Sequence, residues 1–167
     1  MNSAPTQGPA AAASPAERPA GARPAGARSV DEILDAARAR LSRVTPEQAF
    51  AELSAGAPLI DIRPAGQRAA DGEIPGSVVI ERNHLEWRLD PESGARLPWA
   101  TGYDLRPIVI CQEGYTSSLA AAALQDLGLT AATDVDGGYR AWRAAGLPTA
   151  RPAERTVSIA PGASPAY

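Results

Sequence analysis

The chain contains a single cysteine, Cys111, and the residues around it are of the kind that makes a thiol reactive. Cys111 follows the apolar run 107–110, and a short loop and a helix-like segment over 117–127 come directly after it. In such an arrangement of strand, loop and helix, loop N–H groups and the positive end of the helix dipole face the sulfur. These surroundings lower the pKa of a cysteine from about 8.5 into the range of about 3.5–7.5. The pattern predicts a nucleophilic thiolate, and the alternative is a buried, inert thiol, which the loop context disfavours.

A charged pair, Asp61 and Arg63, accompanies a second apolar run over residues 59–62. Sites in parallel sheets form beyond the carboxyl ends of the strands, so we expect Asp61 and Cys111 to lie at the same edge of a sheet. Two interpretations of the pair are open. It is either an ion pair that anchors neighbouring loops, which we favour, or a part of the catalytic machinery.

The elements that must position these residues are marked by clear start and stop signals. Ser29 and Glu32 have the spacing of a capping box, and Thr45, Pro46 and Gln48 start a second helix. Strands are predicted over 59–62, 77–81, 107–110 and 133–135, and later helices over 83–87, 117–127 and 139–145. Short apolar strands that alternate with helices predict a parallel sheet covered on both faces.

The composition narrows the domain organisation and the function classes. Residues 1–28 and 151–167 are rich in Ala and Pro, so we predict a disordered tail at 1–28, a C-terminal tail at 151–167, and a domain over 29–150. A formal net charge of −3 over 167 residues gives no support to a nucleic-acid or membrane-surface role. One cysteine excludes an internal disulfide and a multi-cysteine metal site. With no apolar leader and a free thiol, we expect a cytoplasmic protein.

Four segments, in order along the chain, resemble the signatures of the rhodanese-like domain family. They are residues 59–63 (Leu-Ile-Asp-Ile-Arg), residues 72–77 (Gly-Glu-Ile-Pro-Gly-Ser), the six-residue loop 111–116, and residues 136–142 followed by 145–148. The resemblance covers about residues 45–150. It implies an α/β fold, namely a doubly wound parallel sheet of five strands with helices on both faces.

The resemblance implies a sulfurtransferase that needs no cofactor and no metal. Cys111 would take a sulfane sulfur from a donor such as thiosulfate or a persulfide and hold it as a persulfide. It would then pass the sulfur to a thiophilic acceptor, which is cyanide, a thiol or a protein thiol. The loop N–H groups would stabilise the thiolate and then the persulfide. The residues of this binding loop would be Gln112, Glu113, Gly114, Tyr115, Thr116 and Ser117.

Two departures from the family pattern bear on the donor. Glu113 stands where members that use thiosulfate often have a lysine, so its carboxylate is expected to repel a dianionic donor. A neutral or protein-bound persulfide donor becomes the more plausible alternative. The segment 82–103 is longer than a minimal domain needs, and Arg82, Arg88 or Arg96 could supply anion-binding charge from it.

Two other functions remain as alternatives. The first is a rhodanese-like module that binds a partner or senses redox state without turnover. The second is a phosphatase or arsenate reductase on the same fold, which would need the pattern of a cysteine, five residues and then an arginine that clamps an oxyanion. That position is occupied by Ser117, which argues against the second alternative.

Overall fold

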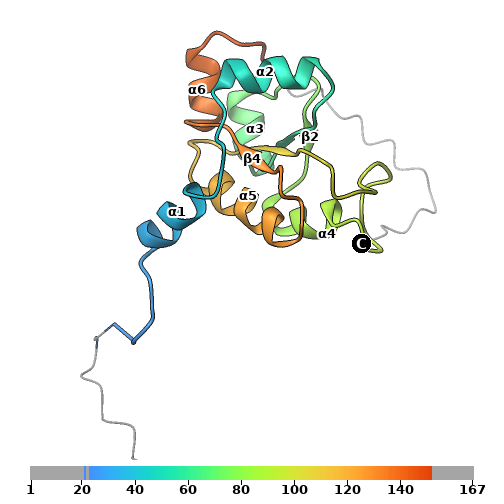
Figure 1. Cartoon of the computed structure of the whole chain (residues 1–167). Coiled ribbons are helices and arrows are strands. Elements are labelled where there is room, and N and C mark those ends of the chain that lie inside the picture. Colours follow the sequence, from blue (N-terminus) through green and yellow to red (C-terminus); the bar gives the residue numbers. More distant parts are fainter. Residues whose placement is uncertain (1–20, 22, 152–167) are drawn as a thin grey trace, which may run out of the picture.

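Four short parallel strands form the sheet at the centre of the computed structural model, which describes residue 21 and residues 23–151 (Figure 1). Their order in the sheet is β2-β1-β3-β4. The strands are β1 (Leu59–Asp61), β2 (Val78–Val79), β3 (Ile108–Ile110) and β4 (Thr133–Asp134). The register pairs Asp61 with Ile110, and Val109 with Asp134, so the carboxyl ends of these strands lie side by side.

The prediction of five strands differs from the described residues, which hold four. At the edge beyond β4, Val44 makes one parallel bridge with Val135 in place of a fifth strand. Pairing ends there because Thr45 caps the next helix and Pro46 has no N–H to donate to a ladder.

Each face of the sheet carries its own apolar cluster, because successive strand residues point to opposite faces. Leu59, Ile108 and Ile110 pack with Trp142 in one cluster, beneath α2 (Pro46–Ser54) and α6 (Gly138–Ala144). On the other face, the cluster takes in α4 (Leu85–Leu89) and α5 (Thr116–Asp126). Figure 1 shows α2 and α6 above the sheet and α4 and α5 below it. The doubly wound α/β fold predicted from the sequence is therefore confirmed.

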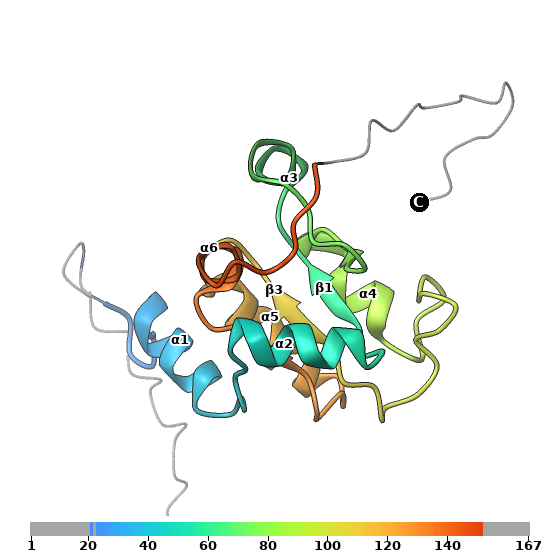
Figure 2. The same cartoon turned by 90° about the horizontal axis from the view of Figure 1, so that it is seen from above.

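The first helix, α1 (Val30–Arg38), lies against α5 and so joins the domain body (Figure 1). Its buried residues are Leu34 and Ala37. Both predicted capping boxes are confirmed: the side chain of Ser29 caps α1, and that of Thr45 caps α2. In Figure 2, α2 passes in front of β1 and β3 while α1 stands to one side. The capping signals in the sequence thus located the starts of α1 and α2 correctly.

Two helices differ from the sequence expectations. The segment 83–87 was predicted as one helix capped by Asn83, but it is a 3-10 helix (η1, Arg82–His84) followed by α4, and Asn83 makes no capping bond. The helix α3 (Ala65–Asp71) was not predicted, because its N-cap is Pro64, which offers no side-chain capping signal. Of the predicted tails, 1–28 and 151–167, residues 1–20, 22 and 152–167 lie outside the described residues. None of the described helices has the length and apolar character needed to cross a bilayer.

An ion pair between Glu52 of α2 and Arg106 leads to a pH-dependent stability. Arg106 Nε lies 2.7 Å from Glu52 Oε2, and this hydrogen bond holds the pKa of Glu52 below its ordinary value of 4.5. Since the folded value lies below the unfolded one, the pair stabilises the fold above about pH 4.5 and its contribution is lost as the pH falls through the lowered value. We expect Glu52→Gln to reduce the free energy of unfolding by about 0.5–1 kcal/mol near neutral pH.

Thermal unfolding of the parent and Glu52→Gln, followed from neutral to acidic pH, measures this effect. The gap between their midpoints should close as the carboxyl of Glu52 becomes protonated. Glu47→Gln, on the exposed side of the same helix, is the matched control. A gap of constant size across the whole range would contradict the prediction.

Candidate active site

Cys111 lies directly after β3, at the point where the chain turns into the loop that precedes α5. The amide nitrogens of Gly114 and Ser117 donate to its Sγ over 3.2 and 3.4 Å, and the Oγ of Ser117 lies 3.2 Å from it. Gly114 has φ +80°, a conformation that places its amide beneath the sulfur and favours glycine. The two amide donors, with the Ser117 hydroxyl beside them, form a cradle suited to an anionic sulfur.

An open pocket of about 930 Å³ gives access to Cys111, although only 8% of the residue is exposed. From the predicted binding loop, the pocket is lined by Gln112, Glu113, Tyr115 and Thr116, whereas Gly114 and Ser117 lie behind the sulfur. Of the predicted supporting residues, Arg63 and Arg82 line the pocket. A substrate can therefore approach the sulfur from the side opposite its backbone donors.

Asp61 and Arg63 form a fully buried ion pair with Nη2 and Oδ2 2.7 Å apart. The guanidinium also donates to the carbonyl of Gly72 over 2.9 Å and stacks 3.6 Å from the ring of Tyr139. Its Nη1 has no partner among the described residues. The pair fastens the end of β1 to the turn after α3, and Asp61 does not line the pocket.

Glu113 and Gln112 attach the binding loop to neighbouring helices. Glu113 forms an ion pair with Arg140 of α6, and the amide of Gln112 donates to Asp71 of α3 over 2.7 Å. The charge of Glu113 is therefore balanced at the pocket wall by a cation that the sequence analysis did not consider. This pair weakens the expected repulsion of a dianionic donor.

Of the three arginines proposed as anion binders, only Arg82 lines the pocket, where it pairs with Glu86 at 2.7 Å. Arg88 donates to the carbonyl of Ala95, and Arg96 to that of Ser93, so both bind their own segment. The segment 82–103 thus contributes one cation to the pocket.

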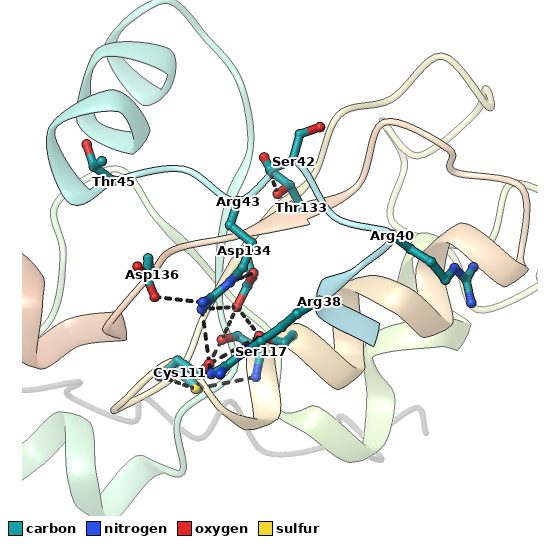
Figure 3. A network of polar contacts seen from close by, with 12 residues as sticks. Arg38, Arg40, Ser42, Arg43, Thr45, Cys111, Ser117, Thr133, Asp134 and Asp136 are labelled. Atoms are coloured by element: carbon teal, nitrogen blue, oxygen red, sulfur yellow. Dashed lines mark hydrogen bonds and ion pairs between the residues drawn. The ribbon is translucent and has the colours of Figure 1, made fainter. Parts of the chain in front are cut away.

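Three residues that the sequence analysis did not select lie behind the loop: Arg38, Arg43 and Asp134 (Figure 3). Asp134 ends β4 and is fully buried, and its Oδ2 accepts from the hydroxyl of Ser117 over 2.9 Å. The strand-end rule that selected Asp61 would have found Asp134 as well, since residues 133–135 were predicted as a strand. No sequence signal links Arg43 to a residue so far along the chain.

Arg43 pairs with two carboxylates, Asp134 and Asp136 (Figure 3). Its Nε lies 2.8 Å from Asp134 Oδ1, and its Nη1 lies 2.7 Å from Asp136 Oδ1. Burial acts to lower the pKa of Arg43, but the hydrogen bonds and charges of the two carboxylates outweigh it and raise that pKa above its ordinary value. The guanidinium therefore remains a cation throughout the range in which the protein works.

The close contact between Gly138 and the loop makes Gly138→Ala a test of how tightly the loop is held. Gly138 has φ +58°, and an added Cβ would meet the Cys111 carbonyl oxygen at 2.5 Å and the Gly114 nitrogen at 2.7 Å. Both contacts are with backbone, which cannot move aside without displacing the sulfur cradle. We expect a loss of about 1–3 kcal/mol in the free energy of unfolding beyond the cost of the positive φ, together with slower alkylation of Cys111.

The matched control is Gly146→Ala, because Gly146 also has positive φ, at +69°, but nothing lies near its added Cβ. It should carry only the strain of the left-handed backbone, about 1–2 kcal/mol. Equal losses of stability and of alkylation rate in the two variants would show that the loop is not wedged against Gly138.

Comparison with known proteins shows the family to which the chain belongs. The model of the rhodanese-like domain matches residues 45–145. The thiosulfate sulfurtransferase GlpE of Stutzerimonas stutzeri is 38% identical over 101 residues, which cover 60% of this chain and 84% of that protein. The protein of the same name from Pseudomonas savastanoi pv. phaseolicola is 37% identical over 102 residues, or 61% of this chain and 87% of that protein.

Solved structures give the same fold. A protein of unknown function from Rhodopseudomonas palustris, described as a "possible tyrosine phosphatase", matches with a TM-score of 0.68 at 33% identity, over 78% of this chain and all of that one. A thiosulfate sulfurtransferase from Pseudomonas aeruginosa matches with a TM-score of 0.52 at 26% identity, over 66% of this chain and 19% of that one.

Proposed function

Because the chain belongs to the rhodanese-like domain family and is a rhodanese-type sulfurtransferase, we propose that Cys111 carries the transferred sulfur as a persulfide. The observation that supports this most directly is the cradle of two backbone amides and one hydroxyl around Sγ, open on its other side to the pocket. Fixed donors of this kind stabilise negative charge on the sulfur before and after transfer.

The reaction consists of two displacements on sulfur. The Cys111 thiolate attacks the outer sulfur of the donor, the S–S bond of the donor breaks, and its remainder leaves with the bonding electrons. A thiophilic acceptor then attacks the terminal sulfur, and Cys111 leaves as a thiolate. Two half-reactions that share one enzyme form predict ping-pong kinetics. Electrons balance without a further oxidant or cofactor.

For the donor we propose a sulfane sulfur compound, either thiosulfate or a persulfide. Arg82 and Arg140 line the pocket together with the carboxylates of Asp71, Glu81 and Glu113. The pairing of Glu113 with Arg140 reduces the repulsion of an anionic donor and so keeps thiosulfate as a candidate beside a persulfide. The pocket volume, about 930 Å³, also leaves room for donors and acceptors bulkier than thiosulfate, such as thiols. A nucleophilic free thiol needs a reducing compartment, so we propose the cytoplasm as the place of the reaction.

The deciding experiment is mass spectrometry of the intact protein after incubation with thiosulfate or with a small-molecule persulfide. We expect a gain of one sulfur atom, located on the peptide that contains Cys111 and lost again on addition of cyanide or a thiol. Cys111→Ser should gain nothing. If no donor loads the parent protein, the module that binds a partner without turnover becomes the better proposal.

The relative described as a possible tyrosine phosphatase raises the other alternative, which the site geometry does not favour. Ser117 occupies the position where an oxyanion-clamping arginine would stand, and its hydroxyl lies between Cys111 and the buried carboxylate of Asp134. A carboxylate behind that hydroxyl opposes the binding of a phosphate dianion. Phosphate release from an aryl phosphate that disappears in Cys111→Ser would support the phosphatase instead.

A further inference from the structure

We propose that Arg43 is a positioning residue for the sulfur of Cys111, which it influences through Asp134 and the hydroxyl of Ser117. This inference rests on the proposed function in one respect, namely that Cys111 carries the reacting sulfur. It adds a residue that lies before the segment 45–145 matched by the family model. Figure 3 shows the path from Arg43 through Asp134 to Ser117 and Cys111.

The Ser117 hydroxyl has a single proton to donate. Two acceptors compete for it: Asp134 Oδ2 at 2.9 Å, and Cys111 Sγ at 3.2 Å. When Cys111 is a thiol, its S–H can donate to Ser117 Oγ while Ser117 donates to Asp134. When the sulfur is a thiolate or a persulfide anion it has no proton to donate, so the hydroxyl must turn its proton toward the sulfur to stabilise it.

Turning that proton away from Asp134 costs little free energy only if Asp134 has other hydrogen-bond donors, because its carboxylate is fully buried and water cannot replace the lost bond. Arg43 supplies two of them, with Nε 2.8 Å from Oδ1 and Nη2 3.1 Å from Oδ2. The hydroxyl of Ser118 supplies a third, 2.8 Å from Oδ2. Asp134 is therefore satisfied even when Ser117 donates to the sulfur.

The same arginine frees the Ser118 proton for this purpose. Ser118 Oγ also lies 3.1 Å from the carbonyl oxygen of Gly114, which is a second acceptor for its one proton. Arg43 Nη2 and Arg38 Nη2 donate to that carbonyl over 3.2 and 2.9 Å. Because the two arginines donate to the Gly114 carbonyl, the Ser118 hydroxyl is free to donate to Asp134. The Ser117 hydroxyl can then donate to the sulfur of Cys111.

Charge supports the same assignment. A buried carboxylate behind the Ser117 hydroxyl would disfavour a negative sulfur on Cys111 unless a cation compensated it. Arg43 supplies that cation in direct contact with Asp134, and its side chain is only 17% exposed, so solvent screens the pair little. The charged groups that surround the sulfur from the packed elements are Arg38, Arg43, Glu113, Asp134 and Asp136, with Arg63, Asp71, Glu81, Arg82 and Arg140 on the pocket side.

The test compares alkylation of Cys111 by iodoacetamide in three variants, since alkylation reports the anionic sulfur without any sulfur donor. Arg43→Gln leaves the buried carboxylate of Asp134 with only the hydroxyls of Ser117 and Ser118 as donors and with no cation beside it. We therefore expect the rate near neutral pH to fall about tenfold and the midpoint of the pH profile to rise by about one unit. Asp134→Asn removes the competing carboxylate and should react at least as fast as the parent. Combining the two substitutions should restore the rate to within about threefold of Asp134→Asn alone.

The matched control is Arg40→Gln, which removes an arginine of the same segment that pairs with Asp126 of α5 at 2.5 Å but does not contact the loop. It should alkylate as the parent does. If Arg43 only braced the loop, Asp134→Asn would be slow as well and the double variant slower still, and either result overturns the inference. An unchanged rate in Arg43→Gln overturns it too.

If Arg43→Gln does not fold, the comparison of the double variant with Asp134→Asn still tests the inference, because the buried carboxylate of Asp134 is absent from both variants. A loss of about tenfold or more between these two would show that Arg43 does not act through Asp134. Failure of this inference is distinct from failure of the proposed function. The latter is judged by sulfur loading of the parent and of Cys111→Ser.

Discussion

Replacing Cys111 by serine is expected to lower the rate of sulfur transfer at least about a thousandfold. The reason is that an alcohol oxygen cannot form or release a persulfide, and the amide donors of Gly114 and Ser117 are too few to ionise an alcohol near neutral pH. Thiocyanate formation from cyanide and thiosulfate measures the rate. The melting temperature should change little, because the serine hydroxyl is smaller than the thiol and can accept from the same amides of Gly114 and Ser117.

The comparison with Cys111→Ala sharpens this prediction. Both variants should be equally inactive, since neither has a thiol, whereas a structural cysteine would give two variants that differ in stability but retain turnover. Residual turnover above about one part in a hundred in either variant would show that the chemistry lies elsewhere. The chain has no second cysteine that could take over the reaction.

The second large effect concerns stability, and it comes from Asp61. Asp61→Asn should reduce the free energy of unfolding by about 3–5 kcal/mol, because the amide cannot neutralise the buried guanidinium of Arg63. Both side chains are fully buried, so water cannot solvate the arginine in place of the carboxylate. Urea unfolding gives the value from the midpoint and the slope.

An exposed pair of the same chemistry serves as the control for Asp61. Asp126→Asn breaks the pair with Arg40, in which the two side chains are 67% and 44% exposed, and it should cost less than about 1 kcal/mol. If Asp61 were instead a catalytic acid or base, Asp61→Asn would lose turnover while its unfolding curve stayed close to that of the parent. That outcome would contradict the anchoring role.

The fold class followed from local signals because each of them acts over a few residues. The capping boxes at Ser29 and Thr45 start helices through their own side chains. The apolar runs that form β1 and β3 are too short for buried helices, so they are buried as strands. The fifth strand implied by the resemblance is absent from the described residues, and α3 was not predicted, for equally local reasons. Pro46 ends the pairing of Val44 after one bridge, and α3 starts at a proline with no capping side chain.

The sequence by itself predicted the candidate nucleophile and the loop that surrounds it, because Cys111, Gly114 and Ser117 lie within one turn of loop and helix. Only the tertiary structure decided what surrounds that cradle. Glu113 is balanced by Arg140, and Asp134 is held by Arg43, through contacts between residues far apart in the chain. Such pairs form because the parallel sheet and the packing of α1 on α5 bring distant segments to one edge, and no local spacing encodes that proximity.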